Sequence, residues 1–174
     1  QMCIRDSVKI NCIVTNNQND YTLENIASHF DKKYVNLHWD KDGVTREEYE
    51  RTLIDTLKEC DVDLVVLAGW NHIVGKELIG SFRYVINMHP ALPDSFVGQN
   101  CIKEAYNAYQ RGEIKYTGSM VHHVTTKLDR GEVISSVNVP IYGNDTYEML
   151  ETRQKLMEKG LLVEAIQKIV AKYN

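Results

Sequence analysis

Short apolar runs alternate with helical segments along this chain, and this alternation limits the possible folds more than any other feature. The predicted strands cover residues 8–15, 34–38, 64–68, 85–89, 116–124 and 132–139, and the predicted helices cover residues 22–30, 46–60, 76–81, 99–111 and 146–172. Strands that alternate with helices indicate an α/β fold with three layers and a mostly parallel sheet. The short turn at 127–131 predicts that the last two strands are antiparallel.

Two segments give the clearest local signals. Thr45 and Glu48 have the spacing of a capping box, which predicts that a helix begins at Arg46. The continuous apolar run 64–68 is typical of a central parallel strand that is covered on both faces.

The composition indicates one globular domain. The 174 residues are 43% hydrophobic and 25% charged, and no linker divides them. We therefore predict a single domain at 8–174. Residues 1–7 resemble the translation of a sequencing adapter, so we interpret them as non-native and expect the natural chain to continue upstream.

Charge and cysteine usage exclude several classes of function. The net charge of −4 argues against a nucleic-acid partner. No apolar run approaches the roughly 18 residues that a membrane-spanning helix needs, so we expect no membrane partner. The four cysteines form no C-x-x-C pair, which predicts reduced thiols, no metal site and a cytoplasmic location.

A polar pair closes the predicted strand 85–89. Asn87 and His89 are two residues apart and therefore share one face of the strand, at the end where α/β sheets build their sites. An amide N–H and a protonated imidazole can together stabilise a developing oxyanion. A single histidine in a strand is more often structural, so the spacing alone leaves both interpretations open.

The turn at 127–131 and the neighbouring histidines are also ambiguous. Asp129 belongs to an Asp-x-Gly pattern that is ordinary in turns. Asp129 can have a catalytic role only if the turn reaches His89, because a nearby carboxylate favours the protonated imidazole. His122 and His123 are adjacent and must face opposite sides of a strand. We predict that one is packed and hydrogen-bonded and that the other is partly exposed.

The remaining motifs are few. Arg46 is either an anion-binding group at a helix start or a solvated charge. The chain contains no G-x-G-x-x-G, P-loop, G-x-S-x-G or H-E-x-x-H pattern, which argues against nucleotide-cofactor, P-loop and serine-hydrolase functions.

Four motifs in order resemble one known family. They are Leu-Val-Val-Leu-Ala-Gly-Trp at 64–70, Ile-Asn-Met-His-Pro-Ala-Leu-Pro-x-x-Phe-x-Gly at 86–98, Thr-Gly-Ser-Met-Val-His-His-Val at 117–124 and Leu-Asp-Arg-Gly-Glu-Val-Ile at 128–134. Together they resemble the folate-dependent formyltransferases, and most closely the branch that acts on glycinamide ribonucleotide in purine synthesis. The resemblance extends over nearly all of the chain from Lys9 to Val170.

The resemblance implies a Rossmann-like formyltransferase fold and a direct formyl transfer. The donor would be 10-formyltetrahydrofolate and the acceptor the amine of glycinamide ribonucleotide, with no metal and no covalent enzyme intermediate. Asn87 and His89 match the catalytic residues that stabilise the tetrahedral oxyanion. Asp129 matches the acid that holds His89 charged and helps to move the amine proton. The expected assembly is a monomer or a weak homodimer.

The resemblance also implies two binding regions. The folate residues would be Arg46, Asn71, His72, Ile73, Val74, Asn87, Thr125, Thr126, Lys127, Leu128 and Asp129. The substrate residues would be Lys155, Leu156, Met157 and Glu158, with Glu158 on the side of the substrate amine.

The sequence departs from the family at two places. His72 stands where an arginine is common. The predicted strand 8–15 matches the family's second strand from Lys9 onward, and the first strand with its phosphate-binding loop has no counterpart in the chain. That first strand lies inside the family's sheet, so we expect a gap between the strands at 8–15 and 64–68, and a chain that is unstable and poorly active by itself.

Related functions remain as alternatives. Formyltetrahydrofolate deformylase, a hydrolase with an N-terminal regulatory domain, shares the catalytic trio. Methionyl-tRNA formyltransferase shares it too, but adds a basic C-terminal domain, whereas this chain is acidic. A folate-binding remnant without catalysis is the alternative from a different class. The motifs at 89–93 and 121–124 resemble the glycinamide ribonucleotide branch more than the others.

Overall fold

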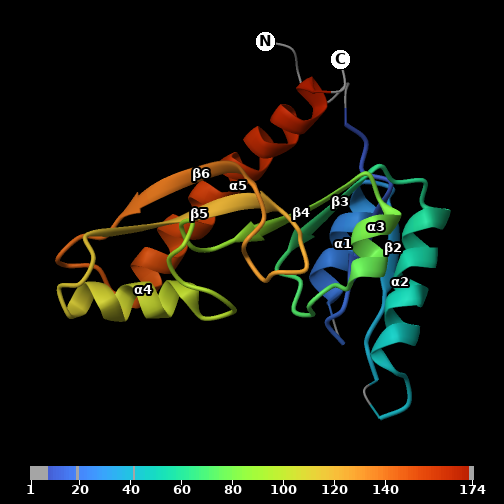
Figure 1. The fold of residues 1–174 in the computed structure, drawn as a ribbon, viewed down its shortest axis with the longest axis horizontal. Helices are drawn as coiled ribbons and strands as arrows, with labels where there is room; N and C mark the ends of the chain where they lie inside the picture. Colours follow the sequence, from blue (N-terminus) through green and yellow to red (C-terminus); the bar gives the residue numbers. More distant parts are fainter. Residues whose placement is uncertain (1–7, 19, 41, 173–174) are drawn as a thin grey trace. The chain divides into compact units, whose positions relative to one another are not determined.

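The computed structural model describes residues 8–18, 20–40 and 42–172, which form the two compact units drawn in Figure 1. The first unit takes in the described residues up to Val65 together with Trp70–Tyr84, and the second takes in Val66–Gly69 and the residues from Val85 onward. Residues 1–7, which we interpret as non-native, lie outside the described residues.

The first unit contains a parallel pair of strands joined by a helix. β1 (Cys12–Thr15) and β2 (Lys33–Asn36) pair in parallel, and α1 (Tyr21–His29) packs against both. The Asp20 carboxylate caps α1 by accepting a hydrogen bond from the Leu23 amide at 3.1 Å. The predicted strand–helix–strand order of this segment is confirmed.

α2 (Arg46–Glu59) begins at the predicted capping box. Thr45 Oγ1 accepts from the Glu48 amide at 3.2 Å, and Glu48 Oε2 accepts from the Thr45 amide at 2.9 Å. These bonds satisfy backbone donors that have no partner within a helix. The buried face of α2 consists of Tyr49, Leu53, Ile54 and Leu57. The short α3 (Lys76–Ser81) completes the unit.

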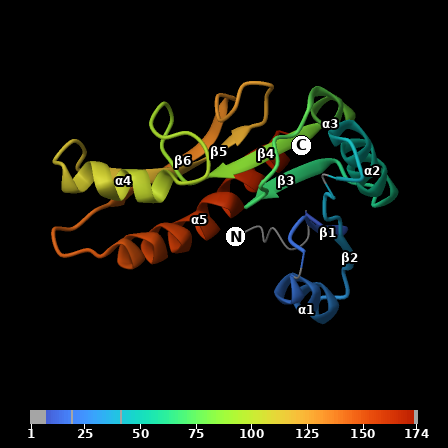
Figure 2. The same ribbon diagram turned by 90° about the horizontal axis from the view of Figure 1, so that it is seen from below.

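The second unit contains most of a four-stranded sheet and two helices that pack against it. β3 (Leu64–Ala68), β4 (Tyr84–His89), β5 (Tyr116–His123) and β6 (Val133–Pro140) form a four-stranded sheet in the order β3-β4-β5-β6. α5 (Tyr147–Ala171) packs against β5 and β6, and α4 (Cys101–Gln110) contacts α5 and β5, as Figures 1 and 2 show. A cluster of Ile102, Val139, Ile141 and Leu150 forms part of the core.

A threonine side chain caps the start of α5. Thr146 Oγ1 accepts from the Met149 amide at 3.3 Å and is the cap. Asp145 instead pairs with Arg153 through two hydrogen bonds of 2.6 and 2.7 Å. α5 is 25 residues long, and no helix of the described residues is both long and apolar enough to cross a membrane.

The sheet differs from the prediction at two strands. The run 64–68 predicts a central strand, but β3 is an outer strand of its sheet, and only Val65 and Leu67 are buried. An apolar run reports neither how many neighbouring strands pair with it nor whether both of its faces are covered. β5 is antiparallel to β4 as well as to β6, whereas only the β5–β6 pair is predicted to be antiparallel.

β1 and β3, between which the resemblance implies a gap, belong to different sheets. Among the described residues β1 pairs with β2 alone, and β3 belongs to the other sheet.

We predict that Thr45→Ala lowers the free energy of unfolding by about 1 kcal/mol, because the first turn of α2 loses its cap. Urea unfolding followed by circular dichroism measures the change. Thr52→Ala is the matched control, since Thr52 Oγ1 only donates to the Glu48 carbonyl inside the same helix. Equal losses in both variants would contradict a specific role for the cap.

Candidate active site

β4 ends in the polar pair that the sequence singles out. Asn87 and His89 lie on the same face of the strand, and His89 is only 3% exposed. Antiparallel pairing places His122 of β5 opposite Asn87. The sheet therefore brings a second imidazole beside the predicted pair.

The turn between β5 and β6 carries Asp129 to His89. Asp129 Oδ1 is 3.5 Å from His89 Nδ1, and the side chains are 6% and 3% exposed. Asp129 Oδ2 accepts from the Gly98 amide at 3.2 Å. Asp129 has φ +51°, a left-handed conformation that costs free energy for a residue with a Cβ. The approach of Asp129 to His89, which the sequence alone leaves open, is confirmed.

Gly131 allows the turn to lie this close to the sheet. A Cβ at this position would overlap the backbone carbonyl of His123 and would lie 3.3 Å from His122 Nδ1. Arg130 forms an ion pair with Asp94 and so ties the turn to the loop after β4. The Asp-x-Gly pattern therefore serves to place Asp129.

His122 orients the Asn87 amide. Its Nδ1 is 2.9 Å from the His123 carbonyl, which only accepts, so Nδ1 carries the hydrogen. Burial lowers the pKa of His122 more than this hydrogen bond raises it, and the neutral ring has its lone pair on Nε2. Asn87 Nδ2 donates to that lone pair at 3.4 Å. The second Nδ2–H is the one that a ligand oxygen can use.

His122 and His123 follow the prediction for adjacent strand residues. His122 is buried and hydrogen-bonded, whereas His123 is only partly buried.

The loop after β4 covers the other side of the His89 ring. His89 Nε2 donates to the Phe96 carbonyl at 2.9 Å and lies 3.7 Å from Cys101 Sγ. Burial raises the pKa of the Cys101 thiol to about 11, so Cys101 is a neutral neighbour and is not activated as a nucleophile. Both ring nitrogens of His89 face acceptors, namely Phe96 O and the Asp129 carboxylate. A doubly protonated imidazolium satisfies both.

The predicted substrate residues lie on one turn of α5, but they face different surroundings. Lys155 pairs with Glu151 at 3.0 Å on the helix surface, and Leu156 and Met157 are exposed. Glu158 is half-buried against the sheet.

Glu158 is held by a serine of β5. Ser119 Oγ donates to Glu158 Oε1 at 2.9 Å. Burial raises the pKa of Glu158, opposed by the Ser119 hydroxyl and by the charges of Lys155 and His89. Glu158 is therefore within electrostatic reach of His89.

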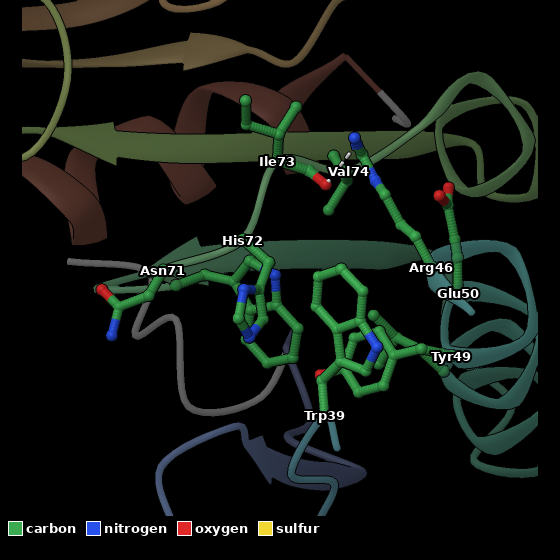
Figure 3. A pocket seen from close by; sticks show the side chains of 10 residues that line it. Trp39, Arg46, Tyr49, Glu50, Asn71, His72, Ile73 and Val74 are labelled. Carbon is green, nitrogen blue, oxygen red and sulfur yellow. Dashed lines mark hydrogen bonds between the residues drawn. The ribbon is translucent and has the colours of Figure 1, made fainter. Parts of the chain in front are cut away.

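A cavity of about 260 Å³ lies within the first unit (Figure 3). Its lining residues are Trp39, Arg46, Tyr49, Glu50, Leu53, Trp70, Asn71, His72, Ile73 and Val74. Figure 3 shows Trp39 and Tyr49 stacked, with ring centroids 5.6 Å apart, and His72 edge-on to both rings at 5.3 and 5.7 Å. The structure thus brings Arg46 together with the predicted folate residues at 71–74.

Two side chains of α2 fix the loop of this cavity. Arg46 Nη2 donates to the Ile73 carbonyl at 2.8 Å, the dashed line in Figure 3. Glu50 Oε1 accepts from the Gly75 amide at 2.8 Å and from the Leu78 amide at 3.1 Å, which caps α3.

The predicted folate residues at 125–128 lie in an exposed turn of the second unit. The turn is stabilised locally, because Thr125 Oγ1 donates to the Lys127 carbonyl at 3.1 Å and accepts from the Lys127 amide at 3.3 Å. Thr126 and Leu128 are exposed beside them. In the described part of the chain, no three His, Cys, Asp or Glu side chains group as metal ligands.

Sequence reasoning missed several residues at these sites. Trp39, Tyr49 and Trp70 line the cavity, but an aromatic residue in a helix or loop gives no signal by which to distinguish a cavity wall from the core. Cys101 and Gln154 are fully buried near His89 and look like ordinary helix residues in the sequence.

Residues 3–166 match the family described as Formyl transferase. This chain belongs to the formyl transferase family. It is 33% identical over 178 residues to the phosphoribosylglycinamide formyltransferase of Schizosaccharomyces pombe. The aligned region covers 96% of this chain and 85% of that relative. The protein of the same name from Dictyostelium discoideum is also 33% identical, with 95% of this chain and 86% of that relative covered.

Solved structures of this formyl transferase's relatives have the same fold. Phosphoribosylglycinamide formyltransferase from Streptococcus pneumoniae has a TM-score of 0.83 at 29% identity, covering 95% of this chain and 89% of that chain. The structure from Bacillus halodurans has a TM-score of 0.85 at 28% identity, covering 98% and 88%. The predicted α/β formyltransferase fold and the transferase class are confirmed.

We predict that His122 makes the protein less stable in acid. Its folded pKa lies below the ordinary 6.5, so protonation favours the unfolded state. The stability that it contributes is present above about pH 6.5 and is lost as the pH falls below that value. In His122→Gln, the pH slope of the free energy of unfolding should shrink by up to about 1.4 kcal/mol per pH unit.

Urea unfolding at several pH values between about 5 and 8 measures this slope. Subtracting the variant's slope from that of the unsubstituted chain removes the contributions of the other titrating groups. Identical slopes would show that His122 has the same pKa in the folded and unfolded states.

Proposed function

We propose that this formyl transferase moves the formyl group of 10-formyltetrahydrofolate to the amine of glycinamide ribonucleotide, a step of purine synthesis. The observation that carries the proposal is the convergence of Asn87, His89 and Asp129 at the end of β4. Support comes from relatives named phosphoribosylglycinamide formyltransferase that match almost the whole chain.

The reaction follows from the geometry of the trio. The amine attacks the formyl carbon, a C–N bond forms, and the carbonyl electron pair moves onto oxygen. The N–H groups of Asn87 and His89 stabilise this oxyanion. When the intermediate collapses, the bond to the folate nitrogen breaks, and the proton from the amine passes to that nitrogen.

Two neighbours prepare His89 for this step. Asp129 holds the ring through Nδ1 and stabilises its positive charge, and it helps to move the amine proton through water. The Phe96 carbonyl occupies Nε2 in this structure. The oxyanion would replace Phe96 O as the acceptor, so the loop after β4 must shift when the substrates bind.

The cavity of the first unit suits part of the folate. Its stacked aromatic walls offer apolar contact to a flat ring, and Arg46 offers a cation to a carboxylate. Trp70 Nε1 is buried and, among the described residues, has no hydrogen-bond partner, which leaves it available as a donor to a ligand. A folate-binding role is also proposed for the turn at 125–129, on its backbone groups.

We predict that Asn87→Ala lowers kcat by about 10²–10³-fold, because one oxyanion donor is lost. His89→Ala and Asp129→Asn should lower it by about 10²–10⁴-fold, because the charged donor is lost or loses its partner. The measurement is the initial rate of formyl transfer to glycinamide ribonucleotide.

Asn138→Ala is the matched control for the amide, since Asn138 is exposed on β6. Each variant is compared with the unsubstituted chain. The same comparison is made in a version that carries the family's first strand and phosphate-binding loop before residue 8. Circular dichroism confirms folding in every case. Rates equal to those of the unsubstituted protein in all three active-site variants would rule out the proposed reaction site.

We predict that Arg46→Ala raises the KM for 10-formyltetrahydrofolate about tenfold and leaves the KM for glycinamide ribonucleotide unchanged. The reason is the loss of a cation at the cavity and of the bond that holds the Ile73 carbonyl. Arg51→Ala, an exposed arginine of the same helix, is the control and should change neither value. A higher KM for glycinamide ribonucleotide alone would contradict a role of Arg46 in folate binding.

A further inference from the structure

A buried hydrogen-bond network lies behind the end of β4. Gln154 of α5 is fully buried, although the other residues on the buried face of the helix are apolar, namely Leu150, Leu161, Ala165 and Ile169. A buried amide weakens a core unless it makes specific hydrogen bonds. The partners of Gln154 therefore define its role.

Gln154 joins α5 to two strands. Its Nε2 is 2.8 Å from the Pro90 carbonyl, 2.8 Å from the Gly118 carbonyl and 3.0 Å from Ser119 Oγ. An amide nitrogen carries two hydrogens, so three acceptors share them. Pro90 directly follows His89, and Gly118 and Ser119 belong to β5. Gln154 thus fixes the backbone beside His89 against β5.

Gly118 permits this close packing. A Cβ at Gly118 would overlap the Val137 carbonyl and the side chain of Leu92, which lies two residues after Pro90. The start of the loop after β4 therefore rests directly on the β5 backbone, and the Gln154 amide holds it there.

Ser119 extends the network to Glu158. The fully buried Ser119 Oγ accepts from Gln154 and donates its own hydrogen to Glu158 Oε1 at 2.9 Å. This bond fixes one carboxylate oxygen and with it the orientation of the carboxylate. Gln154 and Glu158 are one helical turn apart, so one helix face carries both ends of the network.

We propose that Gln154 and Ser119 are positioning residues for the formyl acceptor: Gln154 fixes the Pro90 carbonyl and, through Ser119, aims the Glu158 carboxylate at the acceptor's amine. The inference rests on the proposed function and adds the residues that favour an amine as the acceptor. A carboxylate held in one orientation accepts hydrogen bonds from an amine, whereas one that rotates freely offers no fixed direction.

Ser119→Ala tests the network with two readouts. Carbon-13 NMR of the Glu158 carboxyl should show a higher pKa, because the hydroxyl that stabilises the ionised form is gone. Steady-state kinetics should show a KM for glycinamide ribonucleotide about tenfold higher, with the KM for 10-formyltetrahydrofolate unchanged.

Two matched controls accompany these variants. Ser135 is also buried and donates to a glutamate of α5, Glu164, at 3.2 Å, so Ser135→Ala removes the same kind of bond elsewhere and should change neither readout. Gln154→Leu should impair acceptor binding, while Gln167→Leu on the exposed face of α5 should not. If Gln154→Leu does not fold, the Glu158 pKa and the KM for glycinamide ribonucleotide in Ser119→Ala still test the proposal.

The outcomes separate this inference from the proposed function. An unchanged Glu158 pKa, or an unchanged KM for the ribonucleotide, in Ser119→Ala would overturn the inference while the unsubstituted chain still transfers formyl groups. If the unsubstituted chain and the version that carries the family's first strand and phosphate-binding loop both transfer none, the proposed function fails, and the NMR readout still decides whether Ser119 controls the Glu158 carboxylate.

Discussion

The buried contact between Asp129 and His89 is the interaction on which the proposed active site depends. Both side chains are almost completely buried, and a buried charged pair persists only when its remaining hydrogen bonds are satisfied. The structure supplies two such hydrogen bonds, and a glycine makes the close approach possible. The Gly98 amide donates to Asp129, the Phe96 carbonyl accepts from His89, and Gly131 lets the turn approach the sheet. The strained backbone of Asp129 is maintained by these contacts.

The antiparallel pairing of β4 with β5 supplies the rest of the site. It sets His122 opposite Asn87, so that a neutral imidazole directs the amide, and it brings Ser119 of β5 to Glu158 of α5. The same strand therefore orients both Asn87, the proposed donor to the oxyanion, and Glu158, the proposed contact of the acceptor. Catalytic groups held by rigid strands and a packed helix keep their geometry without help from the substrate.

Local sequence signals predicted the elements well. The capping box at Thr45, the bounds of α3 and the shared face of Asn87 and His89 each depend on residues a few positions apart. The resemblance to known formyltransferases added the trio and Glu158, and the structure brings these residues within reach of one another.

Contacts between distant segments could not be read from local patterns. Gln154 meets Pro90 across 64 positions, and no periodicity in α5 distinguishes it from a solvent-facing glutamine. The direction of β5 relative to β4 depends on how the chain returns through α4. The outer position of β3 depends on which strand lies beside it. The aromatic walls of the cavity likewise come from three separate segments.

The most direct test of the account is the fate of a labelled formyl group. The protein is given 10-formyltetrahydrofolate labelled in the formyl carbon, together with glycinamide ribonucleotide, initiator tRNA and water as competing acceptors. The account predicts that the label accumulates in formylated glycinamide ribonucleotide. Label released mainly as formate, or recovered on the tRNA, would contradict it.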